Sequence, residues 1–454
     1  MKLHIGFDDT DSPQTGCTTY IAALLVEKFH RLGVHFIDYP NLIRLNPNVP
    51  WKTRGNGALC LRIMCEESLF EKIMDCVVET IEANSDLSYR GTDPGIVFLA
   101  GDVPSEVETF AQETIQGLVK IGEAISLIKK SEAEAVGFKK GRGIIGGLAA
   151  VGEGLKGDHT YEFIAYRSAE NRGTQRRVDA SSIVRMDEQM GCLTFNNVDP
   201  ETGRVLITPR GPDPILYGVR GETPEAVRRA HALVLSEEPV ERWIVFRTNH
   251  GTDAHLKRAI SICEVKPYNP VVVRGKVTQE PRIIQGGHVV FQIRDETGAV
   301  DCAAYEPTGK LRETAKLLRI GDLIEAYGGV RPASSGNPVT VNLEKMLIVE
   351  LAPNIVSQNP LCPTCGKRMK SMGKGQGFEC VKCGFHGPNL KKTVSESERP
   401  VKPGLYVVPP RSQRHLTKPL ARYGLEKTNP PRSFDTIVPF HLLSSLEDRN
   451  EMTK

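Results

Sequence analysis

The chain begins with Lys2-Leu3-His4-Ile5-Gly6-Phe7-Asp8-Asp9-Thr10-Asp11-Ser12, and this segment is the most informative one about the fold. A short apolar strand over 2–7 runs directly into three carboxylates within four positions. Like charges at that spacing repel one another unless a cation lies among them. Carboxylate oxygens, together with phosphate oxygens, are the ligands that Mg²⁺ takes in nucleotide sites. We therefore expect Asp8, Asp9 and Asp11 to hold Mg²⁺ on a bound nucleotide.

The next segment predicts a helix whose start faces the same site. Gly16-Cys17-Thr18-Thr19 precedes an apolar run, and a helix is expected over 17–32. The free N–H groups and positive dipole end of a helix N-terminus attract an anion such as a phosphate. An acidic N-cap loop is the alternative, because Asp, Ser and Thr favour caps. A cap uses one acid rather than three, so the pattern favours a site for a metal-bound nucleotide.

Alternating elements in the first half of the chain predict a mixed α/β structure. Strands are expected over 2–7, 34–45, 57–65, 95–99, 159–166, 191–196, 204–207, 214–219 and 240–247, and helices over 17–32, 67–83, 104–129, 142–152 and 223–236. We expect an N-terminal α/β nucleotide-binding domain over 1–157 and an α+β domain over 158–262.

The sequence pattern changes after about residue 268, where short predicted strands alternate with glycine turns. A strand, the turn Asp295-Glu296-Thr297-Gly298, another strand, a helix over 308–318 and Gly321-Asp322 before a further strand follow in order. That order is typical of an OB-fold, expected here over 263–352, which binds nucleic acid. A small β-barrel that binds protein or no ligand stays open as the alternative.

Four cysteines form two C-x₂-C pairs, Cys362 with Cys365 and Cys380 with Cys383. Four thiolates at this spacing complete a closed, structural Zn²⁺ site, and zinc lets a segment too small for its own core fold. A zinc ribbon is therefore expected over 353–390. The other cysteines are scattered among apolar stretches, which favours reduced thiols over a disulfide scaffold.

Composition excludes several classes of protein. The 454 residues are too many for one core. No segment approaches the ~20 apolar residues of a membrane span, and the first residues have no apolar signal core. We therefore expect a cytoplasmic protein with no membrane partner, a monomer or weak dimer. The net charge is only +3, but residues 391–454 hold 12 Lys/Arg against 7 Asp/Glu, and this basic, Pro-containing tail is expected to be partly ordered at best.

Several loops offer further binding residues. The run Lys139-Lys140-Gly141-Arg142-Gly143 precedes a helix and resembles a second phosphate loop, although a surface turn is equally compatible with it. We expect Cys17, Lys139, Lys140, Arg142 and Gly143 to contact the bound nucleotide. The segments 51–57 and 91–95 are either similar binding loops or mere turns. His250 and His255 are better explained as hydrogen-bonding loop residues than as metal ligands.

Taken together, these motifs resemble one family. Asp8-Asp9-Thr10-Asp11-Ser12, Cys17-Thr18-Thr19-Tyr20, Gly141-Arg142-Gly143, Gly211-Pro212-Asp213-Pro214, Tyr217-Gly218-Val219-Arg220-Gly221 and Phe246-Arg247-Thr248-Asn249 are similar to the motifs of archaeal tRNA agmatinylcytidine synthetases. The OB-fold and zinc ribbon come in that family's order, and the resemblance covers about residues 1–390.

The resemblance implies an ATP-dependent ligase that attaches agmatine to C2 of the wobble cytidine of isoleucine tRNA with a CAU anticodon, so that the tRNA reads AUA. ATP would end as AMP and pyrophosphate. It implies a kinase-like N-terminal domain, a ferredoxin-like second domain and phosphorylation of Thr18, with activation of the C2 oxygen. Asp8, Asp9 and Asp11 would act with Thr18 in catalysis. Asp213, Tyr217, Arg220, Arg247 and Asn249 are the expected substrate-binding residues, and charge complementarity makes Asp213 the expected partner of agmatine.

Two other functions remain compatible with the residues. Asp9-Thr10-Asp11 after an apolar strand imitates the D-x-D nucleophile of haloacid-dehalogenase-type phosphatases, although the usual continuation is missing. A non-catalytic tRNA-binding protein with a nucleotide-sensing domain is the other possibility.

Overall fold

The computed structural model describes residues 1–428 and 440–443, and its N-terminal half is built on one mixed sheet. β1 (Lys2–Asp8) lies between β4 (Gly57–Met64) and β5 (Gly95–Ala100), antiparallel to both. The neighbours farther out on these two sides are β3 (Asn41–Arg44) and β6 (Glu134–Gly137), and β2 (His35–Phe36) pairs with β4. The decisive N-terminal strand is thus central in its half of the sheet, and its end carries the acidic loop.

The same sheet continues into the second domain. β3 pairs in parallel with β10 (Val240–Thr248), and the order then runs through β7 (Thr160–Arg167) and β9 (Ile215–Gly221) to β8 (Thr194–Phe195). The strand β22 (His441–Leu443) pairs with residues 242–244 of β10. Main-chain hydrogen bonds therefore join the two domains that the sequence predicted separately.

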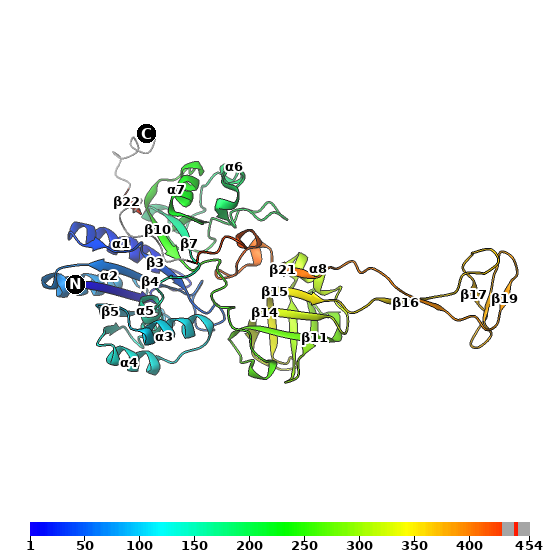
Figure 1. The fold of residues 1–454 in the computed structure, drawn as a ribbon. Helices are drawn as coiled ribbons and strands as arrows, with labels where there is room; N and C mark the ends of the chain where they lie inside the picture. Colours follow the sequence, from blue (N-terminus) through cyan, green and yellow to red (C-terminus); the bar gives the residue numbers. More distant parts are fainter. Residues whose placement is uncertain (429–439, 444–454) are drawn as a thin grey trace.

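Helices cover both faces of the first domain's part of the sheet (Figure 1). α1 (Thr18–Arg31) and α2 (Phe70–Asn84) pack with Leu3, Ile5 and Phe7 in one core. α3 (Ser105–Gln116), α4 (Ile121–Lys130) and α5 (Gly143–Gly152) form a second core on the opposite face. Alternate residues of each strand face opposite sides, so both faces are apolar where helices cover them.

The second domain carries α6 (Ala180–Met190) and α7 (Pro224–Leu233). Helix α6 was not predicted, because its first turn, Ala180-Ser181-Ser182, is polar. Asp179 caps that helix by accepting hydrogen bonds from the backbone N–H groups of Ser181 and Ser182. The predicted strand over 204–207 was wrong, since Val205 forms only an isolated bridge with Val198. The predicted helix over 104–129 is two helices separated at 117–120.

The OB-fold prediction is confirmed. The barrel consists of β11 (Pro270–Ile283), β12 (Val289–Arg294), β13 (Ala299–Ala304), β14 (Leu323–Arg331) and β15 (Thr340–Glu350), with α8 (Lys310–Ala315) between β13 and β14. Parallel pairing of β13 with β15 closes the barrel.

Short 3₁₀ helices occur along the described part of the chain at Glu67–Leu69 (η1), Ala169–Asn171 (η2), Gly191–Leu193 (η3), Ile262–Glu264 (η4), Glu306–Thr308 (η5), Pro410–Ser412 (η6) and Leu420–Arg422 (η7).

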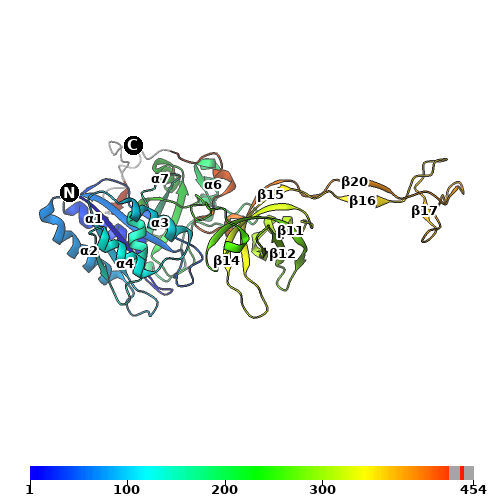
Figure 2. The same ribbon diagram turned by 60° about the horizontal axis from the view of Figure 1, so that its bottom comes forward.

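The zinc-ribbon segment lies far from the rest of the molecule, at the end of a two-stranded stalk (Figures 1 and 2). The stalk is the antiparallel pair β16 (Ile355–Gln358) and β20 (Thr393–Glu396). The ribbon itself contains β17 (Lys370–Ser371), β18 (Phe378–Glu379) and β19 (His386–Gly387). The ribbon packs around a small core of its own that contains Cys362, Met369, Phe378 and Cys380.

The C-terminal segment is far better ordered than the sequence predicted. β21 (Gly404–Val407) adds to the barrel by pairing with β15. Residues 404–428, which we name the C-terminal strap, then run between the barrel and the N-terminal half. Buried ion pairs hold the strap, notably Arg422 with Glu222 and Asp158. The prediction of partial order was therefore wrong for these residues, and for 429–439 and 444–454 it lies outside the described part of the chain.

The residues described contain no helix with the length and apolar character that crossing a bilayer requires.

Candidate functional site

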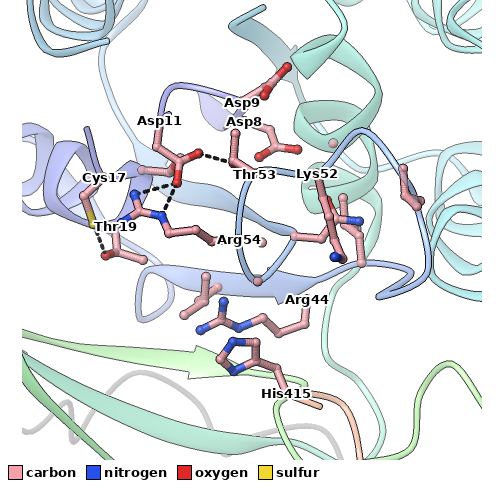
Figure 3. Close-up of a pocket in the computed structure, with 18 of the residues that line it drawn as sticks. Asp8, Asp9, Asp11, Cys17, Thr19, Arg44, Lys52, Thr53, Arg54 and His415 are labelled. Atoms are coloured by element: carbon pink, nitrogen blue, oxygen red, sulfur yellow. Dashed lines mark hydrogen bonds and ion pairs between the residues drawn. The ribbon is translucent and has the colours of Figure 1, made fainter. Parts of the chain in front are cut away.

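A cavity of about 760 Å³ opens at the end of β1. Its walls come from the acidic loop, the start of α1, the segment 49–57, the segment 140–146, and strands β7 and β9 of the second domain. Figure 3 shows the carboxylates at one end, with Arg44 and His415 at the other. The sheet that joins the two domains therefore also places their polar side chains around one space.

The acidic loop leaves β1 with unusual backbone geometry. Asp9 has φ of 62°, a left-handed conformation that non-glycine residues seldom adopt. Its carboxylate accepts hydrogen bonds from Arg142 Nη2 (2.7 Å) and Nε (3.1 Å) and from the backbone N–H of Asp93 (3.2 Å). Burial raises the pKa of Asp9 to about 6, although Arg142 opposes that shift.

Asp8 is the last residue of β1 and precedes Asp9 directly. Burial first, and then the charge of Asp9, raises its pKa to about 8. A carboxyl group with this pKa keeps its proton at neutral pH unless a cation takes the proton's place. The donor set therefore fits a hard divalent cation.

The three carboxylates do not converge on one point, however. Among the described residues, the cluster of three or more metal-ligating groups within 4.8 Å of one another is formed by cysteines, not by these acids. Asp9 is held by Arg142, whereas Asp11 is held by Thr53 and Arg54. One or two carboxylates completed by phosphate oxygens are thus a better description than three protein ligands.

Arg54 ties the acidic loop to the second domain. Its Nε donates to Asp11 at 2.7 Å, its Nη2 donates to the carbonyl of Gly16 at 2.7 Å, and its Nη1 lies 3.2 Å from Asp213. Thr53 Oγ1 donates to Asp11 at 2.8 Å. Asp213 is also paired with Arg176 at 3.3 Å. The segment 51–57 therefore lines the cavity and holds Asp11 and Asp213 in place.

Thr18 is the first residue of α1 and lines the cavity. Its hydroxyl accepts a hydrogen bond from the hydroxyl of Thr10, with an O–O distance of 3.0 Å. Next to it, burial raises the pKa of the Cys17 thiol, so Cys17 stays protonated, and its Sγ lies 3.1 Å from Thr19 Oγ1. The hydroxyl of Thr18 thus lies at the helix start beside the acidic loop.

The glycine-rich run has a packing role that its sequence did not predict. A Cβ on Gly143 would lie 2.4 Å from the carbonyl oxygen of Asp8, and a Cβ on Gly146 would lie 2.0 Å from its Oδ2. These glycines let α5 approach β1 closely. Lys140 and Arg142 line the cavity, whereas Gly143 does not, and Lys139 Nζ donates to the carbonyl of Tyr89 at 2.6 Å instead.

The far end of the cavity contains a buried charge network. Glu162 on β7 contacts Arg44 (3.3 Å), Arg220 (3.1 Å) and His250 (3.4 Å). Although burial opposes it, Arg220 with His250 holds the pKa of Glu162 well below its usual value. Glu162 was not predicted as a site residue, yet an acid inside the apolar run Tyr161-Glu162-Phe163-Ile164 was a usable signal.

Three of the expected substrate-binding side chains lie outside the cavity. The hydroxyl of Tyr217 lies 2.7 Å from His231 Nδ1 in the core. Arg247 pairs with Asp38 at 2.8 Å, and Asn249 bonds the backbone of Arg44 through both its amide oxygen and its nitrogen. Asp213 and Arg220 do line the cavity, so the structure brings together only part of the expected set.

The zinc-site geometry agrees with the cysteine spacing. All four Sγ atoms lie within 4.8 Å of one another, with Cys362–Cys383 and Cys365–Cys380 distances of 3.4 Å. Four thiolates at these separations fit a tetrahedral Zn²⁺ ion. The predicted structural zinc site is confirmed in its ligand set.

The cavity is lined by carboxylates, by the start of a helix and by cations, and the same chain carries an OB-fold and a zinc ribbon. This combination is typical of enzymes that use a nucleotide to act on a nucleic acid. Four family models match the chain: the TiaS TCKD domain over 4–140, the TiaS FLD domain over 141–255, an OB-fold nucleic acid binding domain over 271–349 and the TiaS C-terminal zinc ribbon domain over 359–401. The chain belongs to the TiaS family.

Similar proteins agree with this assignment along the chain. The tRNA 2-agmatinylcytidine synthetase TiaS of Archaeoglobus fulgidus is 43% identical over 94% of this chain and 99% of its own length. The protein of that name from Pyrococcus horikoshii is 43% identical over 92% of this chain and 97% of its own. The crystal structure of a TiaS–tRNA–ATP complex is 43% identical, with a TM-score of 0.82 over 93% of this chain and 97% of that one.

Proposed function

We propose that this chain uses ATP to attach agmatine to C2 of the wobble cytidine of isoleucine tRNA with a CAU anticodon, and that ATP ends as AMP and pyrophosphate. The observation that carries the proposal is one cavity that combines the acidic loop, the Thr18 hydroxyl and cations from Lys140 and Arg142. Relatives described as 2-agmatinylcytidine synthetases support it, as does the crystal structure of TiaS with its tRNA, AMPCPP and agmatine.

We assign the triphosphate to the end of the cavity where β1 stops. Asp8 and one neighbouring acid would hold Mg²⁺ together with phosphate oxygens, and Mg²⁺ would supply charge neutralisation there. Arg142 donates to the Asp9 carboxylate and also lines the cavity. It would therefore orient Asp9 and at the same time contact the phosphates. Lys140 has no ion pair with a carboxylate among the described residues, which leaves its charge for the nucleotide.

Thr18 is the proposed phosphoryl acceptor. Phosphoryl transfer depends more on positioning and charge than on covalent machinery. The O–O distance of 3.0 Å to Thr10 fixes the orientation of its hydroxyl. Formation of AMP requires two phosphoryl groups to leave ATP: the γ-phosphoryl group would go to Thr18 and the β-phosphoryl group to the C2 oxygen, which becomes a leaving group. The primary amine of agmatine would form the new C2–N bond and lose a proton, while the C2–O bond breaks and its oxygen leaves in phosphate. Attack of that phosphate on phospho-Thr18 would release pyrophosphate and restore the hydroxyl.

Asp213 remains the proposed partner for the cationic agmatine, because a guanidinium is best recognised by a carboxylate. Its two arginine partners, Arg54 and Arg176, already occupy part of it, so agmatine would share the carboxylate. The target cytidine has to leave its base stack to react. The OB-fold and the distant zinc ribbon would then hold the body of the tRNA by shape and charge.

The test is mass spectrometry of an isoleucine tRNA transcript incubated with the protein, ATP, Mg²⁺ and agmatine. The proposal expects a mass gain of agmatine less water at the first anticodon position. Thr18→Ala should abolish the gain, while Thr18→Ser, which keeps a hydroxyl, should retain part of it. Tight tRNA binding and intact zinc without any gain would favour the non-catalytic binder instead.

The phosphatase alternative has little support. A nucleophilic Asp9 needs a free carboxylate, whereas Asp9 is engaged by Arg142 and the Asp93 backbone.

We also propose the domain limits 1–157, 158–262, 263–352, 353–390 and 391–454. The protein would be a cytoplasmic monomer or weak dimer.

A further inference from the structure

The C-terminal strap reaches the nucleotide cavity. His415 lies on the cavity wall, and its ring meets that of His250 edge-on with centroids 4.9 Å apart. Burial and the nearby Arg44 guanidinium hold its pKa well below the usual value, so the imidazole is neutral at neutral pH. A residue of the basic tail therefore lines the same space as the acidic loop at the opposite end of the sequence.

His415 and its neighbour hold one particular segment, residues 45–56, which we name the pocket loop. Arg414 Nη1 donates to the carbonyl of Pro47 at 2.9 Å. The ring of His415 lies directly on Gly55, since a Cβ there would be 2.7 Å from His415 Nε2. The strap thus touches the pocket loop near both of its ends.

The OB-fold supports the same loop and the same part of the strap. Glu344 on β15 accepts a hydrogen bond from Thr417 at 2.6 Å and lies 3.5 Å from Arg414 Nε. Asn46 Nδ2 donates to the carbonyl of Tyr268 at 3.0 Å, where the chain enters the barrel. The side chain of Asn48 lies against the backbone of Gly329 on β14.

The other side of the pocket loop contacts the acidic loop, because Thr53 and Arg54 both donate to Asp11. One continuous set of contacts therefore runs from the barrel through Arg414 and the pocket loop to Asp11. Most of these contacts are charge-assisted and part-buried, and the hydrogen bond from Thr417 to Glu344 is fully buried. Charge-assisted hydrogen bonds are roughly twice as strong as neutral ones.

We propose that Arg414 and His415 are positioning residues for the nucleotide site. They fix the pocket loop from the OB-fold side, so that Thr53 and Arg54 hold Asp11 where the metal-bound triphosphate requires it. This deepens the proposed function and rests on it for the identity of the nucleotide and the RNA. Because Arg414 is shared with β15, RNA seated on the barrel and nucleotide in the cavity would strengthen each other's binding, and such coupling is reciprocal.

The experiment uses the full chain with Arg414→Ala, Arg414→Lys and His415→Gln. The dissociation constant of a non-hydrolysable ATP analogue is measured with and without the tRNA transcript, beside a thermal melt. Arg411→Ala is the matched control, because Arg411 lies on the same strap but pairs with Asp199 and Glu201, away from the pocket loop.

Arg414→Ala should raise the dissociation constant of the analogue on the order of 10- to 100-fold, as expected when a binding group is displaced. It should also abolish the decrease of that constant on addition of tRNA. Arg414→Lys should recover part of the affinity, since it keeps the charge but loses the fork that reaches both Pro47 and Glu344. Arg411→Ala should change neither quantity. Equal analogue affinities in Arg414→Ala and Arg411→Ala would overturn the inference.

If Arg414→Ala melts too early to be assayed, the same comparison with Arg414→Lys and His415→Gln decides. Wild-type affinity and coupling in both would overturn the inference. Analogue binding needs no product, so the two proposals fail separately. A wild type that makes no agmatinylated tRNA, with analogue binding still weakened by Arg414→Ala, would remove the proposed function and leave the positioning role.

Discussion

Replacing Gly146 by Ala adds one methyl group and should cost most of the activity. The glycine lies in α5, whose N-terminal turn packs directly on the end of β1. An alanine Cβ there would lie 2.0 Å from Asp8 Oδ2, 2.6 Å from its Cγ and 2.8 Å from its Cβ. The whole carboxyl group, and not only its tip, lies in the way, so a small rotation cannot relieve the overlap.

The size of the effect follows from these distances. Ordinary contact begins at 3.4 Å, so the carboxyl group or the helix must move by about 1.4 Å. Misplacement of a positioned group by about 1 Å can lower turnover on the order of 100-fold, which corresponds to about 2.7 kcal/mol of transition-state stabilisation. For stability, the strain of about 1–3 kcal/mol is offset by about 1 kcal/mol from better helix propensity.

The assay is single-turnover formation of agmatinylated tRNA, with a thermal melt of the same samples. The matched control is Gly122→Ala in α4, where an added Cβ meets no atom within 4 Å. We expect a large loss of rate with a small melting shift for Gly146→Ala, and neither for the control. A folded Gly146→Ala protein that keeps more than about half of the wild-type rate would refute a role for the position of Asp8.

Three other predictions test the strap, the zinc ribbon and the acidic loop. Arg422→Met should destabilise the N-terminal half by about 3 kcal/mol in denaturant titrations, because among the described residues it leaves the buried Glu222 with only Lys427, and the half-buried Asp158 with only Lys418, as ion-pair partners. Adding Glu222→Gln and Asp158→Asn should restore much of the loss, and an equally unstable triple variant would contradict this. Cys380→Ser should release zinc, which atomic absorption measures. It should also weaken tRNA binding and leave the affinity for the ATP analogue unchanged. Retained zinc would argue against the four-thiolate site. The rise in melting temperature caused by Mg²⁺ should grow as pH rises through the pKa of Asp9, about 6, and that of Asp8, about 8. Both acids must lose their protons before they bind a cation. A rise that does not depend on pH would exclude them as ligands.

Much of the fold was predictable because strong local patterns decided it. The apolar strand at 2–7 and the OB-fold turns are short-range signals, and the structure agrees with both. Helix α6 was not predictable in this way, since Ser181 and Ser182 favour caps and turns as readily as a helix. The order of the strap was not predicted because its proline and basic composition resembles a disordered tail, whereas that order comes from acids such as Glu222 and Asp158 elsewhere in the chain.

The candidate site divides in the same manner. Asp8, Asp9, Asp11 and Thr18 could be identified as a group because they are close in sequence, and the structure places all four on the cavity wall. His415 could not be assigned to that wall, because its neighbours in sequence are tail residues. Glu162 had the signal of an acid inside an apolar run, but that signal does not tell which site the acid faces. Tyr217 and Arg247 carried the right chemistry, but their partners His231 and Asp38 draw them away from the cavity.

The candidate groups for the chemistry could be named from residue spacing alone: the acids after β1, the hydroxyl at the helix start and the four thiols. Each of these patterns is local, so the spacing of residue types is enough to specify it. Which groups meet around one cavity, and which partners hold them, depends on the folding of distant segments onto each other. The parallel pairing of β3 with β10 and the docking of the strap bring together residues hundreds of positions apart, and such long-range contacts depend on packing between whole elements that no short pattern records.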